Sequence, residues 1–335
     1  MRILVTGGAG YVGSTTAQRL IEAGHEVTVL DSLLRGYRAA VPGQAELVVG
    51  DIGDGALVER TLRERGIEAV LHCAGRAQVA ESVADPRLYY EANVTVSLAM
   101  LDAMLAADVR RIVFSSSAAV YGDPETEILD EDHPKRPVNP YGETKRAFES
   151  SLDWYARAYG MSAVSLRYFN VAGATDQRGE DHRPETHLIP NMLAGVNGGA
   201  PLKVFGTDYP TPDGTCVRDY IHVDDLADAH TAALAMTAEV SANHVACNLG
   251  SGSGFSVLEV LAAAEAFFGR AIPRTLTARR EGDPPMLVAS NRRAAELLDW
   301  KPRRGTLAEM IGSAWSWREA HPDGYGRAAA SPPEA

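Results

Sequence analysis

The chain has 335 residues, enough for a large core and one or two domains. Hydrophobic residues make up 45% of it and charged residues 23%, which is typical of a globular protein. The formal net charge of -12 and the lack of a basic run argue against nucleic acid and anionic membranes as partners. No segment is long and apolar enough for a signal peptide or a membrane span, and three cysteines suit a reducing cytoplasm.

Short apolar runs alternate with helical patterns along the first half of the chain. The runs predict strands over residues 2–6, 26–31, 45–51, 68–75, 111–117 and 162–170. Long helices are expected over about 87–107 and from Pro140 to about 159. Strands rich in Val, Ile and Leu that alternate with helices predict an α/β fold, a Rossmann-like doubly wound parallel sheet with helices on both faces.

The pattern changes after Asn170, where Gly, Pro, Asp and Thr become frequent and strands and helices are mixed. We expect a nucleotide-binding domain over residues 1–172, to which the chain returns around 219–240. A smaller C-terminal α/β lobe over 173–320 should bind the substrate, across a cleft from the first domain. We expect the last residues, 321–335, to form a disordered tail.

A glycine-rich turn, "VTGGAGYVG", links the first strand to the first helix. Gly7, Gly10 and Gly13 permit a tight turn and let the backbone approach a phosphate, which the N-terminus of the helix then holds. The position between a strand and a helix is the context that a dinucleotide site requires. We therefore expect the turn, with Tyr11 and Val12 at the start of the helix, to bind NAD.

Acidic residues end the next two strands. Asp31 lies roughly 20 residues beyond the glycines, where a carboxylate accepts the ribose 2′-OH and repels a 2′-phosphate, which favours NAD over NADP. Arg35 and Arg38, just beyond it, weaken that preference. Asp51 and Ile52 follow the third strand, where an adenine contact is expected, and a helix N-cap is an equally good interpretation of Asp51.

Three polar residues are expected in one crevice, at the carboxyl ends of the strands. Ser117 ends the strand "RRIVFSSS", and Tyr141 and Lys145 lie one turn apart on the helix of "NPYGETK". Hydride transfer from an alcohol needs a base, and a nearby cation lowers a phenol pKa from its free value of about 10. We expect Tyr141 to be this base, Lys145 to lower its pKa, and Ser117 to position the substrate oxygen.

Longer motifs carry a resemblance to a known family. "TGGAGYVG", "SSSAAVYG", "PYGETK" and "LRYFNVAGA" resemble the extended short-chain dehydrogenase/reductase family. "FGTDYPTPDGTCVRDYIHVDDLADAH" and "RREGDPP" resemble its members that epimerise UDP-sugars, and the match ends near Trp317. The resemblance implies 4-epimerisation of a UDP-hexose by tightly held NAD, through a transient 4-keto sugar. It also suggests a homodimer formed through helices of the first domain, such as those near 87–107 and 140–159.

The resemblance extends the set of site residues. For the cofactor it adds Asn93, Lys145 and Tyr168, the last beside the nicotinamide. For the UDP-sugar it implies Gln78, Ser117, Tyr141, Asn170, His187, Leu188, Arg218, Arg280 and Asp283. Arginine forks suit phosphate oxygens, and a carboxylate at Asp283 suits ribose hydroxyls. The alternatives are surface ion pairs for the arginines and a turn residue before Pro284.

Three positions depart from the family pattern. Ala77 stands where Lys is common, so one contact to a cofactor phosphate is either missing or supplied by Arg76. Leu287, four residues beyond Asp283, is smaller than the usual aromatic residue, so we hypothesise that UDP-GlcNAc is accepted. Ser290 stands where an acid is frequent, and we attach no function to it.

The sequence leaves other functions open. A sugar-nucleotide 4,6-dehydratase is disfavoured, because Ser117 and Ala118 stand where that chemistry needs an Asp-Glu pair. Epimerases of UDP-xylose or a UDP-uronate stay open, since the shape of the sugar pocket decides among them. A non-catalytic NAD-binding regulator has no need of the Ser, Tyr and Lys. The close histidine pair, His182 and His187, is of a kind that is usually accidental, and we predict no metal site.

Overall fold

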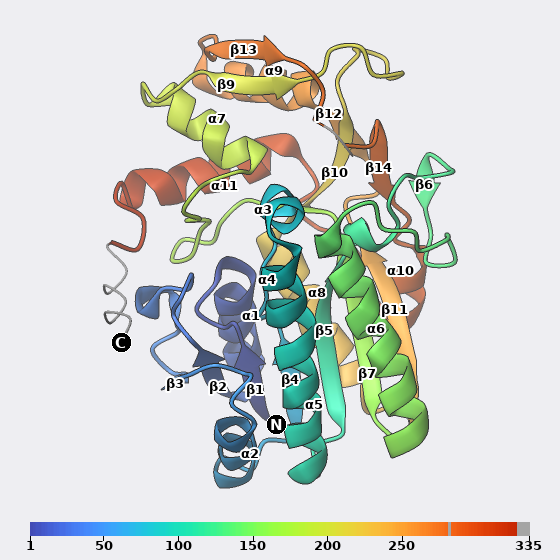
Figure 1. The fold of residues 1–335 in the computed structure, drawn as a ribbon. Coiled ribbons are helices and arrows are strands. Elements are labelled where there is room, and N and C mark those ends of the chain that lie inside the picture. The colour runs from blue at the N-terminus through green and yellow to red at the C-terminus, as the bar shows by residue number, and fades with distance from the viewer. Residues whose placement is uncertain (281–282, 327–335) are drawn as a thin grey trace.

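The computed structural model of the chain describes residues 1–280 and 283–326. Figure 1 shows a large sheet between layers of helices in the lower part of the view, with a smaller lobe above it. Within the part of the chain that is described, no helix is long and apolar enough to cross a membrane.

A seven-stranded parallel sheet forms the larger part, in the order β11-β7-β5-β4-β1-β2-β3. Its strands are β1 (Arg2–Thr6), β2 (Glu26–Asp31), β3 (Glu46–Val49), β4 (Ala69–His72), β5 (Arg111–Ser117), β7 (Ser162–Tyr168) and β11 (His244–Leu249). The expected doubly wound sheet is confirmed, and β1, β2 and β5 have the predicted bounds. The strand order reverses between β1 and β4, which is where a ligand crevice opens in such sheets.

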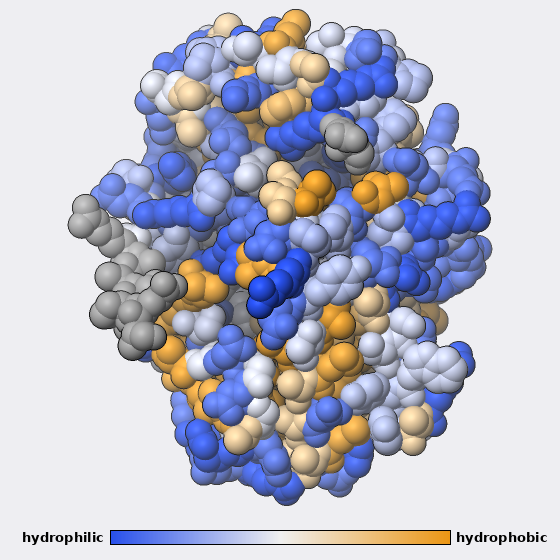
Figure 2. Space-filling view, in the orientation of Figure 1, coloured by the Kyte–Doolittle hydropathy of each residue, from blue (hydrophilic) through white to orange (hydrophobic). Residues whose placement is uncertain are grey.

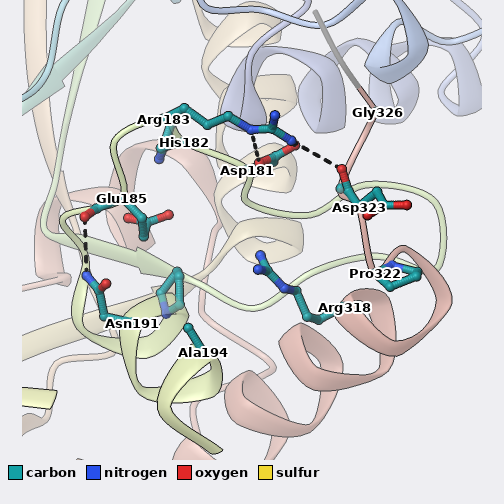
Figure 3. A pocket seen from close by; sticks show the side chains of 12 residues that line it. Asp181, His182, Arg183, Glu185, Asn191, Ala194, Arg318, Pro322, Asp323 and Gly326 are labelled. Carbon is teal, nitrogen blue, oxygen red and sulfur yellow. Dashed lines mark hydrogen bonds and ion pairs between the residues drawn. The ribbon is translucent and has the colours of Figure 1, made fainter. Parts of the chain in front are cut away.

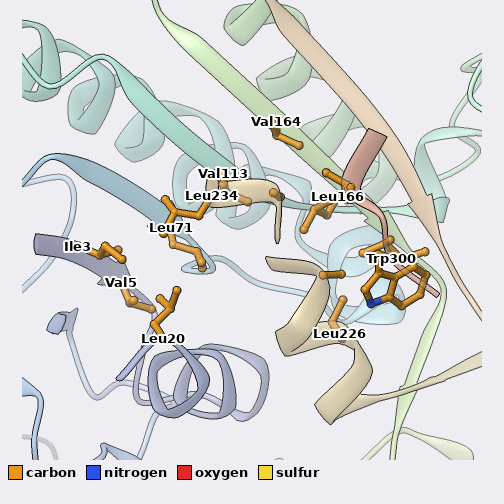
Figure 4. Close-up of a cluster of buried hydrophobic side chains, with 14 of the residues drawn as sticks. Ile3, Val5, Leu20, Leu71, Val113, Val164, Leu166, Leu226, Leu234 and Trp300 are labelled. Carbon is orange, nitrogen blue, oxygen red and sulfur yellow. The ribbon is translucent and has the colours of Figure 1, made fainter. Parts of the chain in front are cut away.

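Helices cover both faces of this sheet. One face carries α1 (Tyr11–Glu22), α8 (Val223–Met236) and α10 (Arg292–Leu298), and the other carries α2 (Gly55–Glu64), α5 (Val96–Ala106) and α6 (Pro140–Tyr159). Successive strand residues point to opposite faces, so Ile3 and Val5 pack with Leu20 in one core (Figure 4), while Leu4 packs with Leu62 in the other. The two cores hold the strand ends rigidly.

The chain returns to the large sheet within the expected stretch and again in two later segments. Within the expected stretch 219–240, α8 does cover the sheet, but β10 (Val217–His222) lies in a second sheet. Two further segments also join the large part: β11 adds an edge strand, and α10 with Trp300 packs against its core. The lobe predicted over 173–320 is therefore interrupted twice by segments that complete the first domain.

The upper lobe is a mixed α/β unit. One sheet has the order β12-β10-β14-β6, with β8 beside β10, and β9 pairs with β13. Its strands are β6 (Ile128–Leu129), β8 (Asn170–Ala172), β9 (Leu202–Phe205), β10, β12 (Gly254–Ser256), β13 (Arg274–Thr277) and β14 (Met286–Ala289). Its helices are α7 (Leu188–Val196), α9 (Val257–Phe268) and α11 (Leu307–Ala320), which share a core of their own. Ser256 and Thr306 start α9 and α11 with capping boxes.

The long helix predicted over 87–107 is interrupted by a wide turn. After α3 (Val79–Ala84), α4 (Pro86–Tyr90) runs into a π-helical turn over Glu91–Thr95, which continues as α5. A turn of this kind changes the direction of the side chains that it carries and is frequent at functional sites. Asn93, one of the expected cofactor residues, lies in it and is buried.

The expected disordered tail begins too early at residue 321. The ring of Tyr325 lies 5.2 Å from the ring of Tyr37 and 5.2 Å from that of Trp317. Its backbone N–H donates to Asp181 Oδ2 at 3.1 Å. Residues 321–326 are therefore packed against the protein, and residues 327–335 lie outside the described part of the chain.

Candidate active site

Two parallel strand ends bring Ser117 and Tyr168 together. These residues end β5 and β7 and are partners in the register of the sheet. The Ser117 Oγ accepts a hydrogen bond from the N–H of Ala119 at 3.1 Å, which holds the side chain at the rim of the crevice. The predicted serine therefore lies beside the residue that was expected to flank the nicotinamide.

Helix α6 brings the tyrosine and the lysine to the same rim. The Asn139 side chain accepts from the N–H of Gly142 at 2.9 Å, and Pro140 takes the first helical position, so the helix begins where the sequence predicted. Tyr141 is only 8% exposed and Lys145 only 6%. The pair therefore faces the sheet. The alternative that Tyr141 and Lys145 are ordinary neighbours on an exposed helix surface is excluded.

Two side chains, Ser117 and Lys145, lie next to the phenol of Tyr141. Burial raises the pKa of Tyr141, and a hydrogen bond with Ser117 opposes the rise. The Lys145 Nζ donates to the carbonyl of Ser115 at 2.9 Å and lies 6.0 Å from the centre of the Tyr141 ring. Burial lowers the pKa of Lys145 itself to about 8. Lys145 thus lies close to the ring that it was expected to influence, and Ser117 is a second neighbour of the phenol.

The glycine turn fits a dinucleotide. Gly7 has a φ of +71°, and a Cβ on it would lie 2.5 Å from the backbone N of Ala74. A Cβ on Gly13 would lie 2.2 Å from the carbonyl oxygen of Gly7. Gly10 is the N-cap of α1 and offers no side chain to its first N–H groups. The turn thus lets a ligand approach the backbone closely, and the first N–H groups of α1 have no side-chain cap from Gly10. Both features suit the pyrophosphate of NAD.

Asp31 holds this turn in shape. Its Oδ2 accepts from the N–H of Ala9 at 2.9 Å and its Oδ1 from that of Leu33 at 2.8 Å, and burial raises its pKa. Each carboxylate oxygen keeps a second lone pair, which suits a ribose hydroxyl. Arg35, whose charge weakened the preference for NAD, pairs with Glu81 at 2.6 Å. The position of Asp31 therefore fits NAD.

The two residues after β3 have different surroundings. Asp51 is exposed and accepts from the N–H of Gly53 at 2.7 Å, while Ile52 is buried in the core beneath it. Helix α2 is capped by Asp54, which accepts from the N–H of Leu57 at 3.0 Å. The alternative interpretation of Asp51 as the helix N-cap is therefore wrong, and its carboxylate remains accessible to an adenine.

Asn93 joins three parts of the site. Its Oδ1 accepts from the N–H of Arg76 at 2.7 Å, and its Nδ2 donates to the Arg76 carbonyl at 3.0 Å and to Thr144 Oγ1 at 3.1 Å. It thereby ties the segment after β4 to α6, next to Lys145. Its amide is engaged by the protein, so Asn93 positions the walls of the cofactor site.

The segment that Asn93 holds after β4 contains the first departure from the family pattern. Ala77 stands where Lys is common in the family, and Arg76 was the alternative source of the missing contact to a cofactor phosphate. The Arg76 guanidinium pairs with Glu81 at 3.3 Å. The Gln78 Nε2 donates to the Pro184 carbonyl at 3.0 Å, which links this segment to the other lobe. Gln78 therefore lies where the two lobes meet.

The expected UDP residues lie on the upper lobe. Arg218, in β10, is buried and forms an ion pair with Asp283. The Arg280 guanidinium stacks on the Phe205 ring, 4.0 Å from its centre. The structure thus brings Arg218 and Asp283 into direct contact, and it presents a second guanidinium with an aromatic face. Phe205 was not predicted, because a single ring at the end of a strand has no distinctive spacing.

Asn170 and Leu287 flank β10 on its two sides. Asn170 pairs with Tyr220 in the β8–β10 register, and Leu287 pairs with Arg218 in the β14–β10 register. Leu287 packs against a small apolar cluster (Ala118, Val120, Tyr121, Leu129, Phe169 and Ala289). Since Ala118 follows Ser117 directly, Leu287 lies near the proposed reacting groups.

The start of α7 carries the last two of the residues expected to contact the substrate. Leu188 is its first residue and packs on the core of the lobe. The Nδ1 of His187 lies 2.5 Å from Glu180 Oε1, and these carboxylate contacts raise the pKa of His187 to about 10. His187 is therefore a cation held by an acid that the sequence did not single out.

Sequence reasoning missed the residues that position the tyrosine. The Ser82 Oγ accepts from the backbone N–H of Tyr141 at 3.2 Å, and the Tyr89 ring stands edge-on to the Tyr141 ring at 6.4 Å. Tyr89 also accepts from the N–H of Gln78 at 2.8 Å. These contacts join α3 and α4 to α6, and residues so distant in the chain share no motif that could have revealed them.

Several known proteins that are similar to this chain in sequence and fold are named UDP-glucose 4-epimerase. A curated "UDP-glucose 4-epimerase" of Lactobacillus helveticus is 47% identical over 328 residues, covering 97% of this chain and 99% of that one. The crystal structure of a UDP-glucose 4-epimerase from Brucella ovis with NAD has a TM-score of 0.90 at 43% identity, covering 94% of this chain and 97% of that one.

A second solved structure, a UDP-glucose 4-epimerase from Bifidobacterium longum, was crystallised with NAD⁺ and UDP. Its TM-score is 0.91 at 37% identity, and the match covers 97% of this chain and all (100%) of that one. Residues 3–250 match the model described as the NAD dependent epimerase/dehydratase family, and the chain belongs to this family.

Proposed function

We propose that the chain is an NAD-dependent 4-epimerase that interconverts UDP-glucose and UDP-galactose. One observation carries the proposal: Ser117, Tyr141 and Lys145 meet at the strand ends, between a glycine turn that fits NAD and a lobe that presents Arg218 with Asp283. The names of the relatives at 47% and 43% identity support the same activity.

The residues divide the chemistry between them. When bound, NAD supplies the redox step, because it accepts a hydride from C4 of the sugar and later returns it to the other face. Ser117 holds the O4 oxygen, and Tyr141 takes its proton and gives it back. Inversion requires the 4-keto sugar to turn between these steps. The firm contacts therefore belong on the UDP part, where Arg218 and Arg280 offer guanidinium groups to phosphate oxygens.

Product analysis with a panel of UDP-sugars tests the proposal. Purified protein is incubated with UDP-galactose, UDP-GlcNAc, UDP-xylose and a UDP-uronate, and the 4-epimers are separated and quantified. We expect rapid conversion of UDP-galactose to UDP-glucose. Conversion of another sugar alone would replace the substrate in this proposal with that sugar. The absence of any product, together with no reduction of bound cofactor, would favour a non-catalytic NAD-binding protein.

We propose further that the protein is a homodimer formed through α5 and α6. Helix α5, "VSLAMLDAMLA", has a single charged residue, and its Leu98 and Leu105 are partly exposed. Figure 2 shows hydrophobic side chains gathered over this part of the molecule. Trp154 of α6 is 64% exposed.

Light scattering should give twice the chain mass, and Leu98→Glu should give the monomer. If the protein without the substitution is a monomer in light scattering, this assembly is refuted.

A cytoplasmic location is also a proposal. Cys73, Cys216 and Cys247 are all free thiols, which supports a reducing compartment. Cell fractionation with an antibody to the chain tests it, because recovery outside the cytoplasmic fraction would contradict it.

A further inference from the structure

Four metal-ligating side chains of a single loop converge just before α7. Glu180, His182, Glu185 and His187 each direct one ligand atom to a common centre, and these atoms all lie within 4.8 Å of one another. The Glu180 Oε1 lies 3.0 Å from His182 Nδ1, and the His187 Nδ1 lies 3.3 Å from Glu185 Oε1. Ligand atoms of a tetrahedral zinc ion stand about 3.3 Å apart. We propose that this cluster is a binding site for a zinc ion.

The loop is shaped so that alternate residues face this centre. Asp181 and Arg183 point the other way, where they pair at 3.3 Å (Figure 3). The Arg183 Nη2 also donates to the Asp323 carbonyl at 3.2 Å, and Asp181 accepts from the N–H of Tyr325. The packed segment 321–326 thus fixes one side of the loop. Glu180 and His182 are left facing the centre on the other side.

The carboxylates are oriented by further contacts. The Glu185 Oε1 accepts from the backbone N–H groups of Thr186 at 2.7 Å and His187 at 2.8 Å. The Glu180 side chain is only 9% exposed, so its position is set by packing. Metal ligands are commonly held by outer contacts of this kind, which reduce the entropy lost when an ion binds. The centre is therefore partly preorganised.

An ion can reach the centre from solvent. The side chains of His182 and His187 are 35% and 44% exposed, and they form its outer side. A cavity of about 650 Å³, lined in part by His182 and Glu185, opens beside them (Figure 3). Arg183 is neutralised by Asp181, and the cationic His187 is paired with Glu180. A metal ion must displace the His187 proton to bind there.

The donor set selects the ion by its chemistry. Two imidazole nitrogens and two carboxylate oxygens suit zinc, whereas calcium and magnesium prefer oxygen ligands alone. Zinc binds neutral imidazole and ionised carboxylate, so its affinity for this set depends on pH. The sequence-based expectation of no metal considered the two histidines by themselves. The two carboxylates that complete the set became apparent only from the folded loop.

A bound ion would secure the junction of the two lobes. Pro184, inside the loop, accepts the hydrogen bond of Gln78, and His187 directly precedes α7. The His182 ring also lies 6.5 Å from the ring of Tyr11, next to the glycine turn. His187 is also one of the expected UDP-sugar residues, but zinc retention can be measured without substrate and so does not rest on the proposed epimerase activity.

Metal analysis of the untagged full-length chain tests the inference. The protein is treated with a chelator, dialysed against equimolar zinc chloride, and assayed for zinc per chain and for melting temperature. We expect one zinc per chain and a higher melting temperature than in the chelated protein. His182→Gln and Glu185→Gln should each lose both effects, while His25→Gln, far from the loop, should keep them.

Two results would overturn the inference: no zinc retained at the equimolar level, or zinc retained equally by all the variants. Circular dichroism checks that each variant is folded, and His187→Gln replaces any that is not. No substrate is present in this experiment, so its failure would leave the proposed epimerase activity untouched. The product analysis with UDP-sugars in turn says nothing about zinc.

Discussion

At the scale of single residues, the phenol of Tyr141 is held between a serine and a buried lysine. Burial raises its pKa and the hydrogen bond with Ser117 lowers it, so the two effects oppose each other. Lys145 is occupied by the Ser115 carbonyl. The Lys145 ammonium has two further donors, and the proposed roles of Lys145 in lowering the Tyr141 pKa and of Ser117 in positioning the substrate are compatible with these contacts.

Replacement of Tyr141 by phenylalanine tests its role as the base. The Tyr141→Phe variant keeps the ring and its edge-on contact with Tyr89, but it has no group to take the O4 proton. We expect kcat for UDP-galactose to fall by roughly 10²–10⁴-fold. The content of bound NAD should be unchanged, which serves as the control. Turnover near that of the unchanged enzyme would contradict the assignment.

Leu287 is the residue that should decide which sugars are accepted. It pairs with Arg218 and packs near Ala118, so a larger side chain there would narrow the space beside Ser117. We expect Leu287→Tyr to lose conversion of UDP-GlcNAc while UDP-galactose is still turned over, and Leu287→Met to keep both. If the unchanged enzyme does not convert UDP-GlcNAc at levels that epimerise UDP-galactose readily, the hypothesis fails.

At the scale of elements, the first turn of α6 sets the position of Tyr141 relative to the end of β5. The Asn139 cap and Pro140 determine where the helix starts, and so where Tyr141 lies relative to the end of β5. The π-helical turn over Glu91–Thr95 does the same for Asn93, which fastens α6 to the segment after β4. The catalytic group and the cofactor wall thus depend on two local features of helices.

Removal of the α6 cap should reduce stability and activity together. Asn139→Ala leaves the N–H of Gly142 without its partner, and we expect a loss of about 1 kcal/mol in the free energy of unfolding. The matched control is Asp54→Ala, which removes the cap of α2 away from the site. Both variants should be destabilised in urea melts, but only Asn139→Ala should also lose kcat. Equal kcat values in the two variants would contradict this role of the cap.

At the scale of the whole molecule, two cores support a crevice between two lobes. The segments that complete the large sheet, β11 and α10, come from the second half of the chain. Neither lobe is therefore a continuous piece of sequence. The interior of the large part also holds two buried histidines: His230 of α8 contacts Ser115 at 2.8 Å, and His72 of β4 contacts Thr6 at 2.7 Å.

The buried histidines predict loss of stability in acid. Burial lowers the pKa of His72 to about 3 and that of His230 to about 4, from the usual 6.5. Between pH 6.5 and 4 the unfolded chain binds protons that the folded chain excludes, so stability falls as the pH falls. The slope is about 1.4 kcal/mol per pH unit for each histidine.

Urea melts from pH 7 to pH 4.5 check this slope. We expect His230→Gln to be less stable than the unchanged protein at neutral pH. Its free energy of unfolding should depend less steeply on pH, by a slope that corresponds to the uptake of about one proton on unfolding. A slope that is the same in both proteins would mean that His230 is not neutral in the fold.

The sequence by itself determined the features that depend on neighbours along the chain. The apolar runs located β1, β2 and β5, the Asn-Pro pair located the start of α6, and the glycine turn indicated NAD. These features follow from strand burial, helix capping and backbone freedom, which are local properties. For the same reason, Ser117, Tyr141 and Lys145 could be proposed as one group from the order of residues alone.

The tertiary structure decided what depends on distant contacts. It showed that β11 joins the large sheet and α10 packs on its core, that a π-helical turn carries Asn93, and that Tyr141 and Lys145 are both buried. It also brought two carboxylates to the His182 and His187 pair. Burial, pKa and ligand convergence depend on which parts of the chain pack together, and a single sequence read along its length carries no measure of that packing.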